Sequence, residues 1–249
     1  MNVAKCVIGF LFAALATLAI SACQTTSSPE LLAPTWQAAD YNVPAKKFGI
    51  EGYCEGSING GIAKKCFPQL KGKKVPVIVF AHGCAGIDYR SAAMIKMFSS
   101  LGYPVFAPNH QARPGWRRSC GHSYGIMGQR FAEIDYALAK LREIPWVDQS
   151  RLILAGFSEG GIVAAEYGGD AFKGRIVLGW GCARGVQTDV PVLNIVGSKD
   201  NETVHGNQLC GLSNDGLTKA IHVNAGHNVL EDPATTQEIK AFLKATIGE

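Results

Sequence analysis

A serine between glycines is the first position in this sequence that could do chemistry. The pattern Gly156-x-Ser158-x-Gly160 lies in LILAGFSEGGIV, between an apolar run of strand length and a segment that continues apolar. Glycines at these positions allow a sharp turn from a strand into a helix, which exposes the serine hydroxyl at the helix N-terminus, where the helix dipole favours negative charge. The pattern indicates a nucleophilic serine, and the alternative is a glycine-rich turn that only packs helix on sheet.

Two downstream residues fit the roles of acid and base for such a serine. A serine hydroxyl is a weak nucleophile at neutral pH and needs a general base, which is in turn oriented by an acid. Asp200 comes just after the apolar run VPVLNIVG, and His227 comes just after the run KAIHVN. The chain order serine, acid, histidine is one of those used for this chemistry, so we predict Asp200 as the acid and His227 as the base.

Other acids and histidines compete for these roles. Asp189 precedes its strand and should lie at the opposite edge of a sheet, while Asp215 lies in a loop between strands. His222 falls inside a strand pattern, where packing is its expected role, and His205 lies in a surface or helical segment. None of the four directly follows a strand as the predicted acid and base do.

Two backbone amides are the expected donors for the negatively charged oxygen that forms when a carbonyl is attacked. Such donors are typically the amide after the nucleophile and another from the loop after an early strand. In this chain they belong to Glu159 and to Cys84 in FAHGCAG, whose side chains stay outside the chemistry. His82 is expected to brace this loop through hydrogen bonds, and a reactive Cys84 thiol is the alternative interpretation.

Alternating strands and helices must position these residues. Apolar runs of strand length lie at 75–82, 103–109, 151–157, 175–180, 190–197 and 219–224. Helical patterns lie among them at 91–101, 126–143, 159–167, 203–212 and 234–246. This alternation predicts an α/β fold, with a mostly parallel central sheet, helices on both faces, and catalytic groups at the C-terminal edge of the strands. An antiparallel hairpin of FGIEGYC and AKKCFPQL is expected to precede this sheet.

The N-terminus has the pattern of an export signal. One positive charge, Lys5, precedes an apolar segment that is too short to span a bilayer comfortably. The segment ends in LAISAC, which resembles the lipobox of bacterial lipoproteins, so we expect a signal peptide over 1–22 and lipidation of Cys23; an ordinary secretory signal is the alternative. Residues 23–46 show no sustained period and are expected to be a flexible tether, with the folded domain at 47–249.

Export determines how the cysteines are interpreted, because an oxidising compartment lets thiols pair. Of the eight cysteines, Cys6 lies in the expected signal peptide and Cys23 is expected to be lipidated. Six are left: Cys54, Cys66, Cys84, Cys120, Cys182 and Cys210. Six cysteines allow fifteen connectivities. Pairing in sequence order fits the expected fold, since the second and third pairs then follow strands at the same sheet edge. No pair has the spacing of a zinc site.

Composition limits the class of partner. The chain has 249 residues, 47% of them hydrophobic, which suffices for one core. The formal net charge is +4, or +3 without Lys5, and is too mild to indicate nucleic-acid binding. Basic residues do gather at Arg113, Arg117, Arg118 and Arg130, and such a cluster is usually a solvated face.

A family resemblance adds to these inferences. The motifs HGCAG, GYPVFAPNHQARPG, EIPWVDQSRLILAGFSEGG, VPVLNIVGSKD and AGHNV resemble those of the α/β-hydrolase superfamily and, within it, of the dienelactone hydrolase-like proteins, over roughly residues 75–245. The resemblance implies the hydrolase fold, the triad positions and acyl hydrolysis through a covalent ester, with no metal or organic cofactor. The namesake enzymes carry a cysteine where this chain has Ser158, so their lactone hydrolysis is not carried over.

We therefore expect an exported, lipid-anchored serine hydrolase that cleaves a small ester or lactone-like substrate. Trp116, Arg117 and Arg118, in a loop after a strand, are expected to favour substrates with anionic groups. Because Gln24 is no obvious retention signal, the expected location is the bacterial cell envelope, on the periplasmic face of the outer membrane. Two alternatives stay open: a small peptidase, although there is no room for the gating domain that such enzymes usually carry, and a non-catalytic envelope lipoprotein that uses the scaffold for binding.

Overall fold

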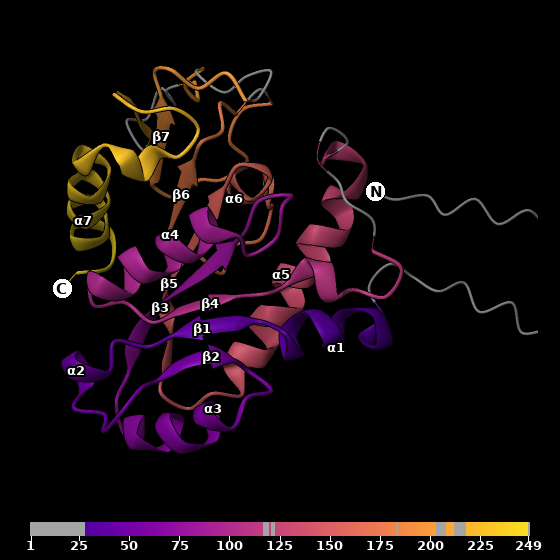
Figure 1. The fold of residues 1–249 in the computed structure, drawn as a ribbon, viewed down its shortest axis with the longest axis vertical. Coiled ribbons are helices and arrows are strands. Elements are labelled where there is room, and N and C mark those ends of the chain that lie inside the picture. The colour runs from indigo at the N-terminus through magenta and orange to yellow at the C-terminus, as the bar shows by residue number, and fades with distance from the viewer. Residues whose placement is uncertain are drawn as a thin grey trace, which may run out of the picture.

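A computed structural model describes residues 28–116, 120, 123–182, 184–202, 208–211 and 218–248. Its strands form one eight-stranded sheet in the order β2-β1-β4-β3-β5-β6-β7-β8 (Figure 1). The strands are β1 (Asp40–Asn42), β2 (Glu55–Ser57), β3 (Val75–Ala81), β4 (Val105–Ala107), β5 (Val147–Phe157), β6 (Gly174–Leu178), β7 (Val192–Gly197) and β8 (Thr218–Val223). All pairings from β4 to β8 are parallel, whereas β1 runs antiparallel to both of its neighbours. The predicted mostly parallel sheet is confirmed.

Helices cover both faces of this sheet. They are α1 (Pro29–Gln37), α2 (Ala45–Phe48), α3 (Gly61–Cys66), α4 (Tyr89–Ser100), α5 (Met127–Arg142), α6 (Glu159–Glu166) and α7 (Pro233–Ile247), with 3-10 turns η1 (Phe67–Leu70), η2 (His110–Ala112), η3 (Ser123–Ile126) and η4 (Val229–Glu231). On one face α1, α5 and α6 contribute Trp36, Leu138 and Ile162 to the core. On the other face α4 and α7 contribute Phe98 and Leu243.

The central strands are apolar because both of their faces are covered. All seven residues of β3 are buried, and they alternate between the two cores, with Val77 and Val79 on one side and Ile78 and Phe80 on the other. A strand buried on both faces appears in a sequence as a continuous apolar run rather than an alternating one. This explains why the runs from 75 onward were recognisable as strands.

The tether predicted over 23–46 is wrong for residues 29–46. Helix α1 buries Leu32 and Trp36, and β1 adds to the sheet with Tyr41 only 2% exposed. The Trp36 ring stacks on Phe106 with centroids 5.8 Å apart. A few large side chains carry this packing, so no sustained period marks it in the sequence. The folded domain begins before 47, and the predicted signal and Cys23 lie outside the described residues.

The predicted hairpin is also corrected. Its second half, AKKCFPQL, is helical and forms the end of α3 and η1, while β2 pairs with β1 in the register Asp40↔Ser57. Ala63 and Leu70 of the helical segment are buried in the core. Short apolar runs do not distinguish strand from helix by periodicity alone, and here the packing of one helical face decided the outcome.

The remaining elements lie close to their predicted positions. The four predicted helices at 91–101, 126–143, 159–167 and 234–246 correspond to α4, α5, α6 and α7. The helix predicted at 203–212 falls mostly outside the described residues, and 208–211 are not helical. Within the described part of the chain, no helix combines the length and the apolar character needed to cross a membrane.

Candidate active site

Ser158 lies on the sharp turn between β5 and α6. Its backbone has φ 56° and ψ −119°, a conformation that residues with a side chain rarely adopt. The neighbouring glycines make the turn possible, because a Cβ atom on Gly156 would lie 1.8 Å from the carbonyl oxygen of Gly160. A Cβ atom on Gly160 would lie 1.8 Å from the carbonyl oxygen of Ala81. The first turn of α6 therefore sits directly against the end of β3.

Asp200 and His227 form a buried pair at the same edge of the sheet. They follow β7 and β8, and each is 5% exposed. The Asp200 carboxylate accepts a hydrogen bond from the Nδ1 of His227 at 2.7 Å and another from the Glu202 backbone N–H at 3.0 Å. With Nδ1 as the donor, the hydrogen-bond pattern leaves Nε2 of His227 as a proton acceptor. The structure brings these two predicted residues together.

Strand order places this pair at the same edge of the sheet as the serine. Strands β5, β6, β7 and β8 are consecutive neighbours in the sheet, so the loops that follow them meet at one edge. The His227 imidazole lies against the Phe157 ring with centroids 4.8 Å apart, next to the residue that precedes the turn. The backbone N–H of Ser158 donates to the Leu178 carbonyl at 2.9 Å, which ties the turn to the end of β6. The imidazole of His227 thus lies against the residue that precedes Ser158 in the chain.

The loop after β3 lies against the same turn. A Cβ atom on Gly83 would be only 3.4 Å from the Cβ of Ser158, so the loop and the turn are in direct contact. Cys84 is the next residue, and Glu159 is the first residue of α6, where a backbone N–H has no intrahelical acceptor. The two amides predicted as oxyanion donors thus belong to segments that pack on each other.

A buried ionic network lies behind these segments, and sequence reasoning missed it. Arg130 donates to the Glu159 carboxylate at 2.7 Å and lies 3.7 Å from Glu133, which in turn is 3.2 Å from Arg113. All four side chains are less than 7% exposed. The expectation that this basic cluster is a solvated face is wrong for Arg113 and Arg130, because each has a buried carboxylate partner. Burial raises the pKa of Glu133, and the two arginines oppose that shift.

Two histidines extend the network. His82 Nδ1 donates to the Gly83 carbonyl at 2.8 Å, so its Nε2 accepts from the backbone N–H and from Nδ1 of His110 at 3.3 and 2.9 Å. Burial, with a contribution from Arg130, lowers the pKa of His82 to about 3, and burial likewise lowers the pKa of His110. His82 therefore braces the loop as a neutral group, as predicted.

The loop after β4 is described in part. Arg117 and Arg118 lie outside the described residues. Trp116 is half-buried, and its ring packs edge-on against that of His110 with centroids 5.7 Å apart. Its indole Nε1 is buried and has no hydrogen-bond partner among the described residues. The structure thus places Trp116 next to the buried histidines.

The six cysteines pair in sequence order. The disulfides are Cys54–Cys66, Cys84–Cys120 and Cys182–Cys210, with Cα–Cα distances of 5.6, 5.1 and 4.7 Å. The second bridge ties the loop after β3 to the loop after β4, and the third ties the segment after β6 to the one after β7. Because Cys84 is bonded, the alternative of a reactive thiol at this position is excluded for the oxidised protein.

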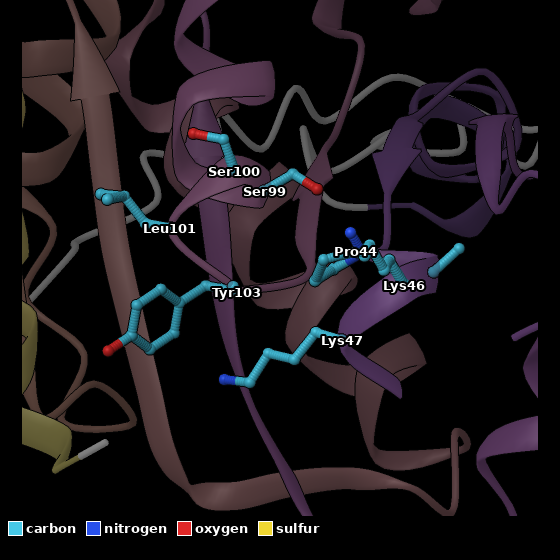
Figure 2. Close-up of a pocket in the computed structure, with 9 residues that line it drawn as sticks. Pro44, Lys46, Lys47, Ser99, Ser100, Leu101 and Tyr103 are labelled. Carbon is cyan, nitrogen blue, oxygen red and sulfur yellow. The ribbon is translucent and has the colours of Figure 1, made fainter. Parts of the chain in front are cut away.

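Two of the four competing residues are described by the structure, and both are exposed. Asp189 precedes β7 and is exposed, and His222 is exposed on β8, whereas Asp215 and His205 lie outside the described residues. Figure 2 shows a separate groove of about 770 Å³ between α2 and the end of α4, where Lys47 extends toward the Tyr103 ring. Tyr103 precedes β4, so this groove lies at the opposite sheet edge and contains no predicted site residue. Among the described residues, no group of three or more His, Cys, Asp or Glu side chains could hold a metal ion.

Comparison with known proteins identifies the fold. No protein-family model and no curated protein sequence matches the chain. Solved structures do match, among them a protein of Klebsiella pneumoniae described as a dienelactone hydrolase, 15% identical over 72% of this chain and 88% of that one, with a TM-score of 0.54. An esterase of Pyrobaculum calidifontis is 13% identical over 70% and 78% of the two chains, with a TM-score of 0.51.

A third neighbour is a dienelactone hydrolase-like promiscuous phosphotriesterase, P91, from metagenomic libraries. It is 16% identical over 72% of this chain and 89% of that one, with a TM-score of 0.52. At these identities the likeness establishes the fold alone. The chain has the α/β-hydrolase fold, and its structural neighbours include dienelactone hydrolase-like proteins and esterases.

Proposed function

We propose that this chain is a serine hydrolase that cleaves small carboxylic esters or lactone-like substrates through an acyl-enzyme on Ser158. The observation that carries the proposal is the buried Asp200–His227 hydrogen bond beside a serine in a strained turn. A backbone conformation that only glycine adopts comfortably costs about 1–3 kcal/mol at another residue, and such strain is typical of functional sites. The neighbours' names, esterase and dienelactone hydrolase-like, support the same reaction class.

The proposed reaction has two halves. In the first, Nε2 of His227 takes the Ser158 hydroxyl proton as Oγ attacks the ester carbonyl carbon, and the Cys84 and Glu159 amides donate to the oxyanion. The carbon–oxygen bond to the alcohol then breaks, and His227 gives that alcohol its proton. In the second half, His227 takes a proton from water, which attacks the acyl carbon; the acid leaves and Ser158 Oγ regains the proton. Asp200 orients the imidazole and stabilises its charged form.

The export and lipid anchor belong to the proposal too. We infer that residues 1–22 are removed and that Cys23 carries the lipid, which would hold the enzyme in the cell envelope on the periplasmic face of the outer membrane. The three disulfides support an oxidising compartment, since disulfides persist there and are rare in the cytosol. The lipid would then hold the chain at the membrane.

Active-site labelling tests the proposed function. The oxidised protein is treated with a fluorophosphonate probe, and the adduct is mapped by mass spectrometry in the wild type, Ser158→Ala and His227→Ala. We expect a phosphonyl adduct on Ser158 that both variants lose, together with hydrolysis of p-nitrophenyl butyrate. A folded wild type without adduct or hydrolysis contradicts the proposal and supports the non-catalytic binding protein, while cleavage of peptides in preference to esters supports the peptidase.

A further inference from the structure

Arg130 is a buried arginine of α5 that contacts both segments of the proposed oxyanion hole. Its Nη1 donates to Oε1 of Glu159 at 2.7 Å, and its Nη2 donates to the backbone carbonyl of His82 at 2.8 Å. The residue is 4% exposed. One guanidinium therefore joins the start of α6 to the loop after β3. Among the described residues, no backbone hydrogen bond connects this helix to this loop.

The two contacts of Arg130 lie next to the backbone amides that we propose as oxyanion donors. Glu159 is itself one of the proposed donors, and Cys84 follows His82 by two residues. The two segments also touch at Gly83, where a Cβ atom would come within 3.4 Å of the Ser158 Cβ. A change in the separation of the segments would consequently move the two amides relative to each other and to the serine.

We propose that Arg130 is a positioning residue that sets the geometry of the oxyanion hole, an inference that rests on the proposed serine hydrolase function. It acts through the Glu159 carboxylate and the His82 carbonyl and does not touch the substrate. Oxyanion donors act only when they lie about 2.7–3.1 Å from the position of the developing charge. A guanidinium suits this task because its donors are held in a rigid planar fork.

Charge gives Arg130 a second effect on the same site. The Glu159 carboxylate is 2% exposed, and its Oε2 atom has no hydrogen-bond partner among the described residues. Among the described residues, Arg130 is the cation that pairs with this carboxylate, since the His110 Nε2, at 3.9 Å, belongs to a ring whose pKa burial lowers. Without Arg130, the first residue of α6 would carry a buried, uncompensated negative charge beside the place where the oxyanion forms.

The kinetics of two single variants test this inference. Arg130→Lys keeps the positive charge but carries all its donors on one nitrogen, so we expect it to lose the planar fork that bridges the two acceptors. We expect kcat for p-nitrophenyl butyrate, and the rate of phosphonylation by the fluorophosphonate, to fall about 10- to 100-fold while KM stays within about twofold. Arg142→Met, an exposed arginine on the same helix, is the control for substitution on α5 and should keep wild-type kinetics.

A double variant separates positioning from stability. Arg130→Met leaves a buried carboxylate unpaired, so its melting temperature should fall, and adding Glu159→Gln should restore it because the uncompensated charge is gone. The kcat of this double variant should remain low, since nothing holds the His82 carbonyl. A wild-type kcat in Arg130→Lys would overturn the positioning role, and so would recovery of both kcat and stability in the double variant. Neither result would affect the proposed hydrolase function. A wild type that neither hydrolyses the ester nor forms the adduct overturns the proposed function and this inference with it.

Discussion

At the scale of single residues, the site depends on a few positions that are costly in themselves. Ser158 has a left-handed backbone, Glu159 is a carboxylate in the core, and Arg130 is the cation that compensates it. Each departs from what stability alone would select, because strained backbone and buried charge both oppose folding. Their meeting at one helix terminus supports the proposal that this terminus serves a reaction.

Removal of the strain at Ser158 should stabilise the protein. We expect Ser158→Gly to be more stable than Ser158→Ala by about 1 kcal/mol. Glycine adopts φ 56° without a steric penalty, whereas alanine keeps the penalty that serine has. Both variants should be inactive toward esters. Urea denaturation of the two variants under the same conditions measures the difference, and equal stabilities would show that the turn is not strained.

At the scale of elements, the loops after β3 and β4 work as one unit. The Cys84–Cys120 disulfide joins them covalently, and the hydrogen bonds between His110 and His82 join them a second time. Behind them, Arg130 connects the first loop to α6. These links fix the loop of Cys84 from three directions, which suits a loop whose backbone amide must stay in place.

Removal of this bridge should affect stability and catalysis together. Cys84→Ser with Cys120→Ser opens a crosslink with a sequence separation of 36, which chain entropy values at about 4 kcal/mol. We expect a lower melting temperature and a reduced kcat for p-nitrophenyl butyrate. The matched control, Cys54→Ser with Cys66→Ser, opens a crosslink of separation 12 away from the site and should lower stability but not kcat. Equal kcat in both double variants would contradict the role of the first bridge.

At the scale of the whole molecule, the central sheet is extended by a segment that precedes the first parallel strand. Strands β1 and β2 add to the sheet next to β4, and α1 packs beside α5 (Figure 1). The loops that follow β3 and β4 carry buried polar groups, including His82 and His110, which are 0% and 1% exposed. These buried neutral histidines affect the stability of the whole fold, since unfolding exposes both to water.

Stability should consequently decrease when the pH falls below about 6.5. The pKa of His82 is lowered from 6.5 to about 3, and that of His110 is lowered as well, so the unfolded chain binds protons that the folded chain does not. Between about pH 6.5 and 5.5 each histidine should remove about 1 kcal/mol from the free energy of unfolding. The raised pKa of Glu133 acts with the opposite sign, because its folded form binds a proton that the unfolded form releases.

Urea denaturation across this window measures the effect. The variant His110→Asn should show about half of the wild-type decrease, because one of the two titrating groups is gone. His222→Asn, which removes an exposed imidazole of β8, is the control. A His110→Asn decrease as large as that of the wild type would show that His110 does not contribute to the pH dependence.

The sequence by itself determined the parts of this protein that depend on local pattern. Apolar runs marked β3 to β7 and a weaker one marked β8, which is partly exposed. The positions that follow these strands selected Ser158, Asp200 and His227 as candidates, because parallel strands bring their C-terminal ends to one edge. The glycines around Ser158 predicted the turn, since only small residues fit there. Pairing of the cysteines in sequence order was consistent with the same edge but was one of several possibilities.

Only the tertiary structure decided the features that depend on distant partners. Arg130 looks like a surface residue in the sequence, and its acceptors lie 29 and 48 residues away, so no local period connects them. The helical state of Gly61–Cys66 and the pairing of β1 with β4 likewise depend on contacts with the core. The physical reason is that hydrophobic periodicity is a property of one element, whereas burial and compensation of charge are decided only when elements from separate parts of the chain pack together.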